Sequence, residues 1–180
     1  MKKVVFAHGL EGSPQGTKAM YLRERFDAIA PWLGELDLPG QVEALQKALP
    51  TAGTAVVVGS SLGGLAALGL ANRCPDRIHH LVLLAPAVGM ERHKDEHPDV
   101  EAKRPGLFDQ AGRFSTLSVP PGLPCTIIHG MEDSMVRFEE VLALAKRSPS
   151  SWLILVHDDH PLLNAKDLIC SVVEQEAGDH

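Results

Sequence analysis

The sequence predicts a doubly wound, three-layer α/β/α sandwich whose all-parallel sheet has about six strands. The first observation is a series of short, uninterrupted apolar runs, among them "AVVV" at 55–58 and "LVLL" at 81–84. Runs without polar alternation are typical of strands that are covered on both faces. The second observation is that segments of helical periodicity separate these runs along the chain. Strand–helix alternation of this kind produces parallel strands joined by right-handed crossovers.

Each expected strand is a short apolar run rich in β-branched residues. The strands are expected at 3–7, 27–30, 54–59, 80–85, 125–129 and 152–157. The segments between them have the periodicity of helices. The helices are expected at about 16–25, 41–49, 61–72, 135–147 and 161–176.

Residues 86–124 depart from this alternation because they contain no clear strand. They hold the charged stretch "ERHKDEHPDVEAKR" and end in "VPPGLP". One interpretation is a solvated surface excursion, since runs of charge usually face water. The other is a small cap over a site at the strand ends, because a long connection in a compact domain is often a lid or a binding loop. We expect a single domain over residues 1–180 in which 86–124 is a short cap-like insertion.

Composition narrows the class of protein. The chain has 180 residues, of which 44% are hydrophobic, so it can bury a substantial core. No apolar run approaches the length of about 18 residues that a membrane span requires. The net charge of −6 argues against nucleic acid as a partner, because phosphates require basic residues.

The N-terminus and the cysteines indicate a cytoplasmic protein. The opening "MKKVVFAHGL" has an apolar run too short for the core of a signal peptide, and no small-residue cleavage site follows it. Cys74, Cys125 and Cys170 are odd in number, and their spacing fits neither a zinc site nor a disulfide framework. We expect free thiols, which suit a reducing compartment.

The stretch "GSSLGG" at 59–64 places a serine where a strand meets a helix. Gly59, Ser61 and Gly63 form the pattern G-x-S-x-G, which at such a junction is typical of a nucleophile elbow. The turn is so sharp that side chains two residues before and after the serine would collide, and glycine at both positions removes the collision. The simpler alternative is a serine in a glycine-rich turn. Ser60 fits the pattern less well, because its neighbours at the same spacing are not glycines.

A serine hydroxyl is a weak nucleophile, so it requires a base that is itself oriented by an acid. His160 follows the last expected strand, and Asp133 lies in the loop after the strand before it. With Ser61, these residues all lie at the carboxyl ends of parallel strands, where such sheets place their sites. We expect Ser61 to attack, His160 to act as general base and then as acid, and Asp133 to orient His160.

Neighbouring residues offer alternatives for the base and the acid. His157 is the alternative base, but it ends a strand and would point along the sheet rather than over it. Glu132, Asp158 and Asp159 are nearby carboxylates, and the last two also suit a turn. His129 is expected to pack at a strand end.

These motifs together resemble those of the α/β-hydrolase superfamily, in particular its compact bacterial serine esterases and thioesterases. The resemblance rests on "HGLEGSP" after the first strand, "GSSLGG" at the elbow, "HGMED" and "DDH", which span residues 8–160. It implies a minimal α/β-hydrolase fold with a short cap, in which the chain opens on what resembles the superfamily's third strand. The "HG-x-x-D" spacing resembles the superfamily's acid loop and favours Asp133 as the acid.

A tetrahedral intermediate needs hydrogen-bond donors for its negative oxygen. The candidates are two backbone amides, that of Leu62 beside the nucleophile and that of Leu10 after the first strand. Gly9 would let this loop approach the substrate closely. His8 has a catalytic residue type, but its position resembles the superfamily's structural histidine beside the oxyanion loop, so we expect it to support the site.

Other classes of site have less support. No group of histidines and carboxylates has the spacing of metal ligands, so we expect no metal and no cofactor. The segment "HGLEGSPQGTK" is glycine-rich and ends in lysine, but it lacks the G-x-x-x-x-G-K-[ST] pattern of a phosphate-binding loop.

The motifs and the resemblance predict an enzyme that hydrolyses carboxylic esters of small to medium acyl groups through an acyl-enzyme. The acyl group would lie under residues 86–124, against Leu107 and Phe108. Acyl thioester hydrolysis is the alternative within this class, because the same machinery serves both leaving groups. An alternative of another class is a non-catalytic binding or regulatory module on a hydrolase scaffold. The expected partner is a small-molecule ester or thioester.

Overall fold

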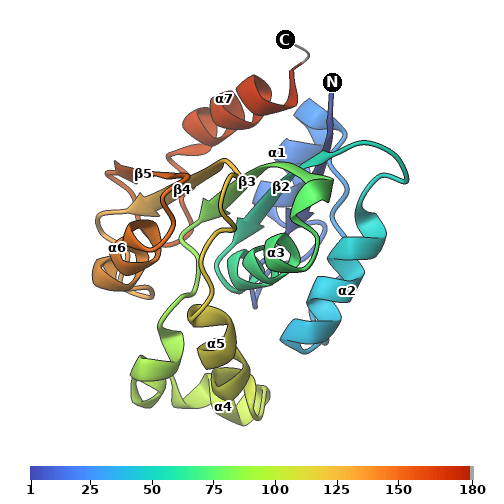
Figure 1. The fold of residues 1–180 in the computed structure, drawn as a ribbon. Coiled ribbons are helices and arrows are strands. Elements are labelled where there is room, and N and C mark those ends of the chain that lie inside the picture. Colours follow the sequence, from blue (N-terminus) through green and yellow to red (C-terminus); the bar gives the residue numbers. More distant parts are fainter. Residues whose placement is uncertain (179–180) are drawn as a thin grey trace.

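The computed structural model describes residues 1–178, and one parallel sheet of five strands lies at its centre (Figure 1). The strands are β1 (Lys3–Ala7), β2 (Ala55–Ser60), β3 (Ile78–Leu84), β4 (Cys125–Gly130) and β5 (Ser151–Val156). Their order across the sheet follows their order along the chain. All neighbouring strands are parallel, which confirms the predicted architecture.

The sixth strand, predicted at 27–30, is reduced to a single bridge beside β1. The amide and the carbonyl of Ile29 bond to β1 with N···O distances of 2.9 and 2.8 Å. Asp27 turns the chain with a φ of 52° where the preceding helix ends. Pro31 follows and has no amide hydrogen with which to continue a ladder. The extended segment between these two residues is therefore too short to form a strand.

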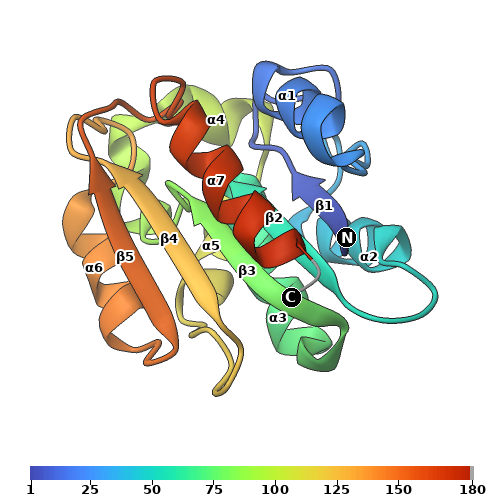
Figure 2. The ribbon, with the colours of Figure 1, turned by 90° about the horizontal axis from the view of Figure 1, so that it is seen from above.

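Helices cover both faces of the sheet (Figure 2). On one face lie α1 (Thr17–Phe26) and α7 (Lys166–Ala177). On the other face lie α2 (Leu38–Ala48), α3 (Leu62–Arg73) and α6 (Phe138–Lys146). Each set forms its own apolar cluster with the strand residues that face it. Within residues 1–178, no helix is both long and apolar enough to cross a bilayer.

Strand β2 explains why the apolar runs lack polar alternation. All six of its residues are buried. Val56 and Val58 pack beneath α1 and α7, whereas Ala55 and Val57 pack beneath α2 and α3. Since successive side chains of a strand point to opposite faces, a strand covered on both faces is apolar at every position.

Residues 86–124 form a helical segment between β3 and β4. It contains the 3-10 helix η2 (Met90–Glu96), α4 (Pro98–Lys103) and α5 (Leu107–Ser115). Helices α4 and α5 lie at one end of the molecule, away from α7 (Figure 1). Leu107 and Ala111 of α5 are buried in the same cluster as the apolar residues of α3, so this segment packs onto the body of the fold.

Two helices begin later than the sequence predicts. Helix α6 begins at Phe138 and α7 at Lys166. In the loop before each helix a carboxylate, that of Asp133 or that of Asp158, accepts backbone amides. Short acidic side chains compete with helices in this way. Both loops therefore extend at the carboxyl ends of the strands, where they shape the site described next.

Candidate active site

Ser61 lies between β2 and α3 in a backbone conformation that few residues other than glycine adopt. Its φ is 54° and its ψ is −119°, which costs a non-glycine residue about 1–3 kcal/mol. Backbone hydrogen bonds to the end of β3 and to the loop after it hold Ser61 in this conformation. The Ser61 amide donates to Leu84 O (2.9 Å), and the Ser61 carbonyl accepts from the Ala87 amide (3.0 Å). The hydroxyl thus stands where β2 ends and α3 begins.

Two glycines make this turn possible. A Cβ on Gly59 would lie 2.6 Å from the carbonyl oxygen of Gly63, and a Cβ on Gly63 would overlap the carbonyl oxygen of Ala7. These neighbours are backbone atoms, which cannot move aside as a side chain can. Glycine at both positions is therefore a packing requirement of the turn.

The His160 side chain lies between Ser61 and Asp133. Its Nε2 is 2.9 Å from Ser61 Oγ, and its Nδ1 is 2.8 Å from Asp133 Oδ2. With Asp133 ionised, Nδ1 carries the hydrogen and donates it to the carboxylate, so Nε2 accepts the hydrogen of the Ser61 hydroxyl. The fold thus brings these three residues into one hydrogen-bonded chain.

The surroundings of Asp133 keep its carboxyl group ionised. Its side chain has no solvent exposure, and its Oδ1 accepts the amides of Met135 and Val136, both at 2.8 Å. Burial by itself would raise the pKa of Asp133. The hydrogen bonds from His160 and from the two amides outweigh this effect and hold the pKa below its ordinary value. Asp133 is therefore an anion at neutral pH.

A second imidazole, that of His129, lies beside Asp133. Its Nδ1 is 3.7 Å from Asp133 Oδ2, which is beyond hydrogen-bond distance, and the residue is buried at the end of β4. Burial lowers the pKa of His129, and the Asp133 charge opposes this effect. The ring lies near that of Phe138, with 6.5 Å between centroids. His129 thus packs at a strand end.

The alternative base and acids lie outside the chain formed by Ser61, His160 and Asp133. His157, Glu132 and Asp159 are exposed on the surface. None of these three residues lines the cavity beside Ser61 that is described below.

Asp158, considered above as an alternative acid or as a turn residue, anchors the loop that carries His160. It is buried, and its carboxylate accepts two backbone amides at 2.9 Å and the side-chain amide of Asn164 at 3.1 Å. Its carbonyl accepts the amide of Glu132 (3.0 Å), so the loop of the base is tied to the loop of the acid. The sequence indicates this anchor only through the pair of aspartates before His160. It does not say which of the two is buried and which is exposed.

Lys18 of α1 is a further residue that sequence reasoning missed. Its Nζ donates to the carbonyl oxygen of Pro161 (2.5 Å), directly after His160. Burial lowers the pKa of Lys18, while the charges of Asp158 and Asp159 oppose this effect. Lys18 therefore provides a second attachment for the loop of the base.

His8 connects the loop after β1 to the chain before α2. Its Nε2 accepts the amide of Leu33 (3.1 Å), and its Nδ1 donates to the carbonyl of Gly9 (3.0 Å). A nitrogen that accepts a hydrogen bond carries no hydrogen, so this imidazole is neutral. Burial lowers the pKa of His8, which the bond to Gly9 partly opposes. Both ring nitrogens of His8 thus form hydrogen bonds that fix the loop after β1.

A cavity of about 460 Å³ opens beside Ser61 and His160. The loop after β1, the start of α1, the segment η2–α4 and the loops after β4 and β5 form its walls. The wall is mainly apolar and includes Leu10, Leu62, Met90, Val100, Met135 and Leu163. Charged groups also reach it, from Glu11, Lys18 and Asp99.

The two backbone amides considered for an oxyanion border this cavity. Leu62 is the first residue of α3, where the amide has no acceptor within the helix, and both Leu10 and Leu62 line the cavity. Gly9 packs directly against the elbow, since a Cβ at this position would lie 3.2 Å from Ser61 Cβ. The Gly9–Leu10 backbone therefore runs beside the hydroxyl.

The cap contributes different residues to the cavity from those expected. Leu107 and Phe108 are 2% and 3% exposed, and neither lines the cavity. Leu107 belongs to the core cluster shared with α3. Met90 and Val100 form the cap wall instead. Helical periodicity identifies an apolar face but does not say what that face covers, which is why the expectation for Leu107 and Phe108 was wrong.

Within residues 1–178, no group of three histidines, cysteines or carboxylates is placed to hold a metal ion. The thiols of Cys74, Cys125 and Cys170 are free.

Sequence comparison connects the chain to one family and to a curated relative. The model of the "Uncharacterised protein family (UPF0227)" matches residues 3–113. The mitochondrial palmitoyl-protein thioesterase ABHD10 of Rattus norvegicus is 27% identical, in a match that covers 67% of this chain and 51% of that protein. The chain thus spans about half the length of this relative.

Solved structures connect the fold to α/β-hydrolases. The mouse alpha/beta hydrolase domain-containing protein 10 matches with a TM-score of 0.78 at 21% identity, over 96% of this chain and 88% of that one. Est1E of Butyrivibrio proteoclasticus with bound ferulic acid matches with a TM-score of 0.74 at 17% identity, over 97% and 87%. The chain therefore has the fold of the α/β-hydrolases, and it belongs to the family UPF0227.

Proposed function

We propose that the protein is a serine hydrolase that cleaves carboxylic esters of small to medium acyl groups. The observation that carries this proposal is the chain of hydrogen bonds from Asp133 through His160 to Ser61, with distances of 2.8 and 2.9 Å. A hydroxyl, a base and an orienting acid in this order are the arrangement required for nucleophilic acyl transfer. The cavity beside them offers a mainly apolar wall to an acyl group.

In the first half of the reaction, Ser61 Oγ attacks the ester carbonyl and its proton moves to His160 Nε2. The resulting imidazolium is stabilised by Asp133, whose pKa is held low. The amides of Leu10 and Leu62 donate to the negative oxygen of the tetrahedral intermediate. His160 then gives its proton to the departing alkoxide, and an acyl-enzyme and an alcohol result.

In the second half, water replaces the alcohol. His160 Nε2 takes a proton from the water, whose oxygen attacks the acyl carbonyl. The same two amides stabilise the second tetrahedral intermediate, and His160 returns the proton to Ser61 Oγ as the acid departs. The cycle consumes one water and one ester and restores the starting protonation of all three residues.

Thioester hydrolysis is the second candidate. The rat relative is named as a palmitoyl-protein thioesterase, and the same residues serve a thiolate as readily as an alkoxide. The ferulic acid bound to Est1E is a carboxylic acid, which hydrolysis of either an ester or a thioester would release. We propose a small-molecule ester or thioester as the partner and the cytoplasm as the location, which the free cysteines support.

A serine-reactive fluorophosphonate probe tests the proposal. Wild type should be labelled, and Ser61→Ala should not be, while Ser171→Ala, which removes an exposed serine of α7, should be labelled like wild type. His160→Ala should lower kcat by at least about 10³-fold, because such residues act as a unit. A folded wild type that stays unlabelled would instead indicate a non-catalytic binding module.

A substrate panel separates esters from thioesters. The values of kcat/KM for p-nitrophenyl esters of rising chain length are compared with those for acyl-CoAs of the same lengths. Higher values for the esters support the proposed function, and higher values for the acyl-CoAs support the second candidate.

A further inference from the structure

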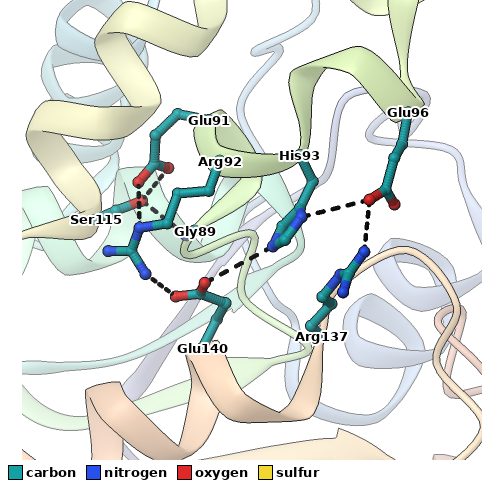
Figure 3. A network of polar contacts seen from close by, with 8 residues as sticks. All are labelled: Gly89, Glu91, Arg92, His93, Glu96, Ser115, Arg137 and Glu140. Carbon is teal, nitrogen blue, oxygen red and sulfur yellow. Dashed lines mark hydrogen bonds and ion pairs between the residues drawn. The ribbon is translucent and has the colours of Figure 1, made fainter.

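A network of polar contacts between side chains connects the cap segment to α6 beside the cavity (Figure 3). Arg92, His93 and Glu96 extend from η2, and Arg137 and Glu140 extend from the start of α6. We call these five residues the cap clasp.

Three of the contacts in the cap clasp join η2 to the start of α6. Arg92 Nη1 forms an ion pair with Glu140 Oε2. Arg137 Nη2 is 2.5 Å from Glu96 Oε1, and His93 Nε2 is 3.7 Å from Glu140 Oε1. His93 Nδ1 also lies 3.4 Å from Glu96 Oε1, so it connects the two ion pairs (Figure 3).

Glu140 is the most sheltered charge in the cap clasp. Its side chain is 14% exposed, whereas those of Arg92 and Arg137 are 57% and 54% exposed. Pairs between fully exposed charges contribute little, and shelter from water strengthens a pair. Glu140 also packs over Gly89, where a Cβ would overlap Glu140 Cδ. Glu140 therefore has both a charged and a steric contact with the cap.

The first turn of η2 is attached to α5 as well. The amide of Gly89 donates to Ser115 Oγ (3.0 Å), and this buried hydroxyl donates to Glu91 Oε2 (3.0 Å). Helix η2 is thus held on one side by α5 and on the other by α6. Loss of the contacts to α6 would leave the attachment to α5 in place as a hinge.

The cap clasp joins two walls of the cavity. Met90, the first residue of η2, and Val100 of α4 line the cavity from the cap. Val136, directly before Arg137, lines it from the opposite loop. None of the five clasp residues is among the cavity-lining residues. The clasp thus sets the position of the cap wall without contributing to the surface that a substrate meets.

We infer that the cap clasp holds the cap wall against the loop before α6 and thereby limits the length of the acyl group that the cavity accepts. This inference rests on the proposed function. In the closed arrangement the cavity measures about 460 Å³. Movement of η2 and α4 away from α6 would carry Met90 and Val100 outward and lengthen the apolar wall. The clasp residues form no contact with Ser61, so the effect falls on size selection rather than on the chemistry.

A matched pair of variants tests the inference. Glu140→Gln removes the charge that faces Arg92 and His93 while keeping the size of the side chain over Gly89. Glu139→Gln removes the neighbouring charge, which is exposed to water, and serves as the control. The measured quantity is the kcat/KM for p-nitrophenyl octanoate divided by that for p-nitrophenyl acetate.

We expect E140Q to raise this ratio about fivefold over wild type, as the loss of a partly sheltered ion pair predicts. E139Q should keep the wild-type ratio. Arg92→Gln should raise the ratio as well, and the double variant R92Q/E140Q should show no further increase, because both changes break the same pair.

Trypsin cleavage provides a readout that does not depend on activity. The cap carries residues after which trypsin can cleave, at Arg92, Lys94 and Lys103, whereas Pro105 prevents cleavage after Arg104. Cleavage within the cap should be faster in E140Q than in E139Q if the clasp holds the cap closed. The melting temperatures of both variants show whether either substitution has disturbed the whole fold.

The outcomes separate the inference from the proposed function. An active wild type with equal ratios and equal cleavage rates in E140Q and E139Q overturns the inference and leaves the proposed function intact. A wild type that turns over no ester or thioester overturns both. A higher ratio with faster cap cleavage in E140Q alone supports the inference.

Discussion

Replacing Asp133 with asparagine should remove most of the turnover while leaving the fold intact, because two backbone amides determine how the asparagine side chain is oriented. In the wild type, Asp133 Oδ1 accepts these two amides and Oδ2 accepts His160 Nδ1. Asparagine offers only one oxygen for these two tasks. If the oxygen stays on the amides, the NH₂ group faces His160 Nδ1 and forces the imidazole hydrogen onto Nε2. The ring then cannot accept the proton of Ser61.

The opposite orientation of the asparagine is unfavourable. The NH₂ group would face two backbone donors at a buried position, and each unpaired donor costs about 1–3 kcal/mol. The total of about 2–6 kcal/mol keeps most molecules in the inactive tautomer. At about 1.4 kcal/mol for each factor of ten, kcat should fall by about 30-fold to about 10⁴-fold.

The assay measures kcat and KM for p-nitrophenyl butyrate, with circular dichroism to follow folding. Glu132→Gln, which changes the exposed carboxylate next to Asp133, is the matched control and should retain wild-type kcat. A D133N protein that melts like wild type and keeps kcat within tenfold of it would refute this account of the tautomer.

Three further substitutions test the supports of the site. Gly63→Ala should lower the melting temperature sharply or prevent folding, because its Cβ overlaps two carbonyl oxygens. Gly53→Ala places its Cβ in open space, so it should reduce stability only by the cost of a left-handed conformation, about 1–2 kcal/mol. Similar melting temperatures for the Gly63→Ala and Gly53→Ala variants would contradict this explanation. Asp158→Ala should lower the free energy of unfolding in urea by about 2–4 kcal/mol and reduce kcat more than it changes KM, since three donors lose their acceptor. The exposed Asp159→Ala is its control, and an equal loss of kcat there would count against a positioning role. For His8, the folded pKa lies below the unfolded value of 6.5, so its contribution to stability is present above pH 6.5 and lost as pH falls through the folded pKa. Between about pH 7.5 and about pH 5, the melting temperature of wild type should fall more steeply than that of His8→Gln, and parallel curves would argue against this role.

Predictions from the sequence were confirmed where the type of a residue depends directly on its local environment. The continuous apolar run of β2 predicts a strand because a strand covered on both faces must be apolar at each position. The run of the edge strand β5 also predicts a strand, although Trp152 and Leu155 are exposed there. Gly59 and Gly63 predict the elbow because only glycine tolerates the backbone contacts there. Local patterns of this kind require no knowledge of the neighbouring elements.

Sequence reasoning was less successful where the environment comes from distant parts of the chain. Leu107 and Phe108 have the character of a ligand-binding face, yet they are buried and do not line the cavity. The charged residues of η2 are compatible with a solvated surface, and their contacts with Glu140 of α6 depend on packing between elements far apart in sequence. Asp158 and Asp159 are identical in type, and only the loop geometry buries the first and exposes the second.

The amino-acid sequence alone thus determined the parallel α/β architecture and the elbow at Ser61, because strand burial and turn chemistry are local properties. Together with the resemblance to α/β-hydrolases, it also singled out Asp133 and His160. The tertiary structure decided the distances of 2.8 and 2.9 Å between these side chains, the walls of the cavity and the contacts that attach the cap. These features arise from long-range packing, in which residues as far apart as Ser61 and His160, separated by 99 positions, meet only when the whole sheet has formed.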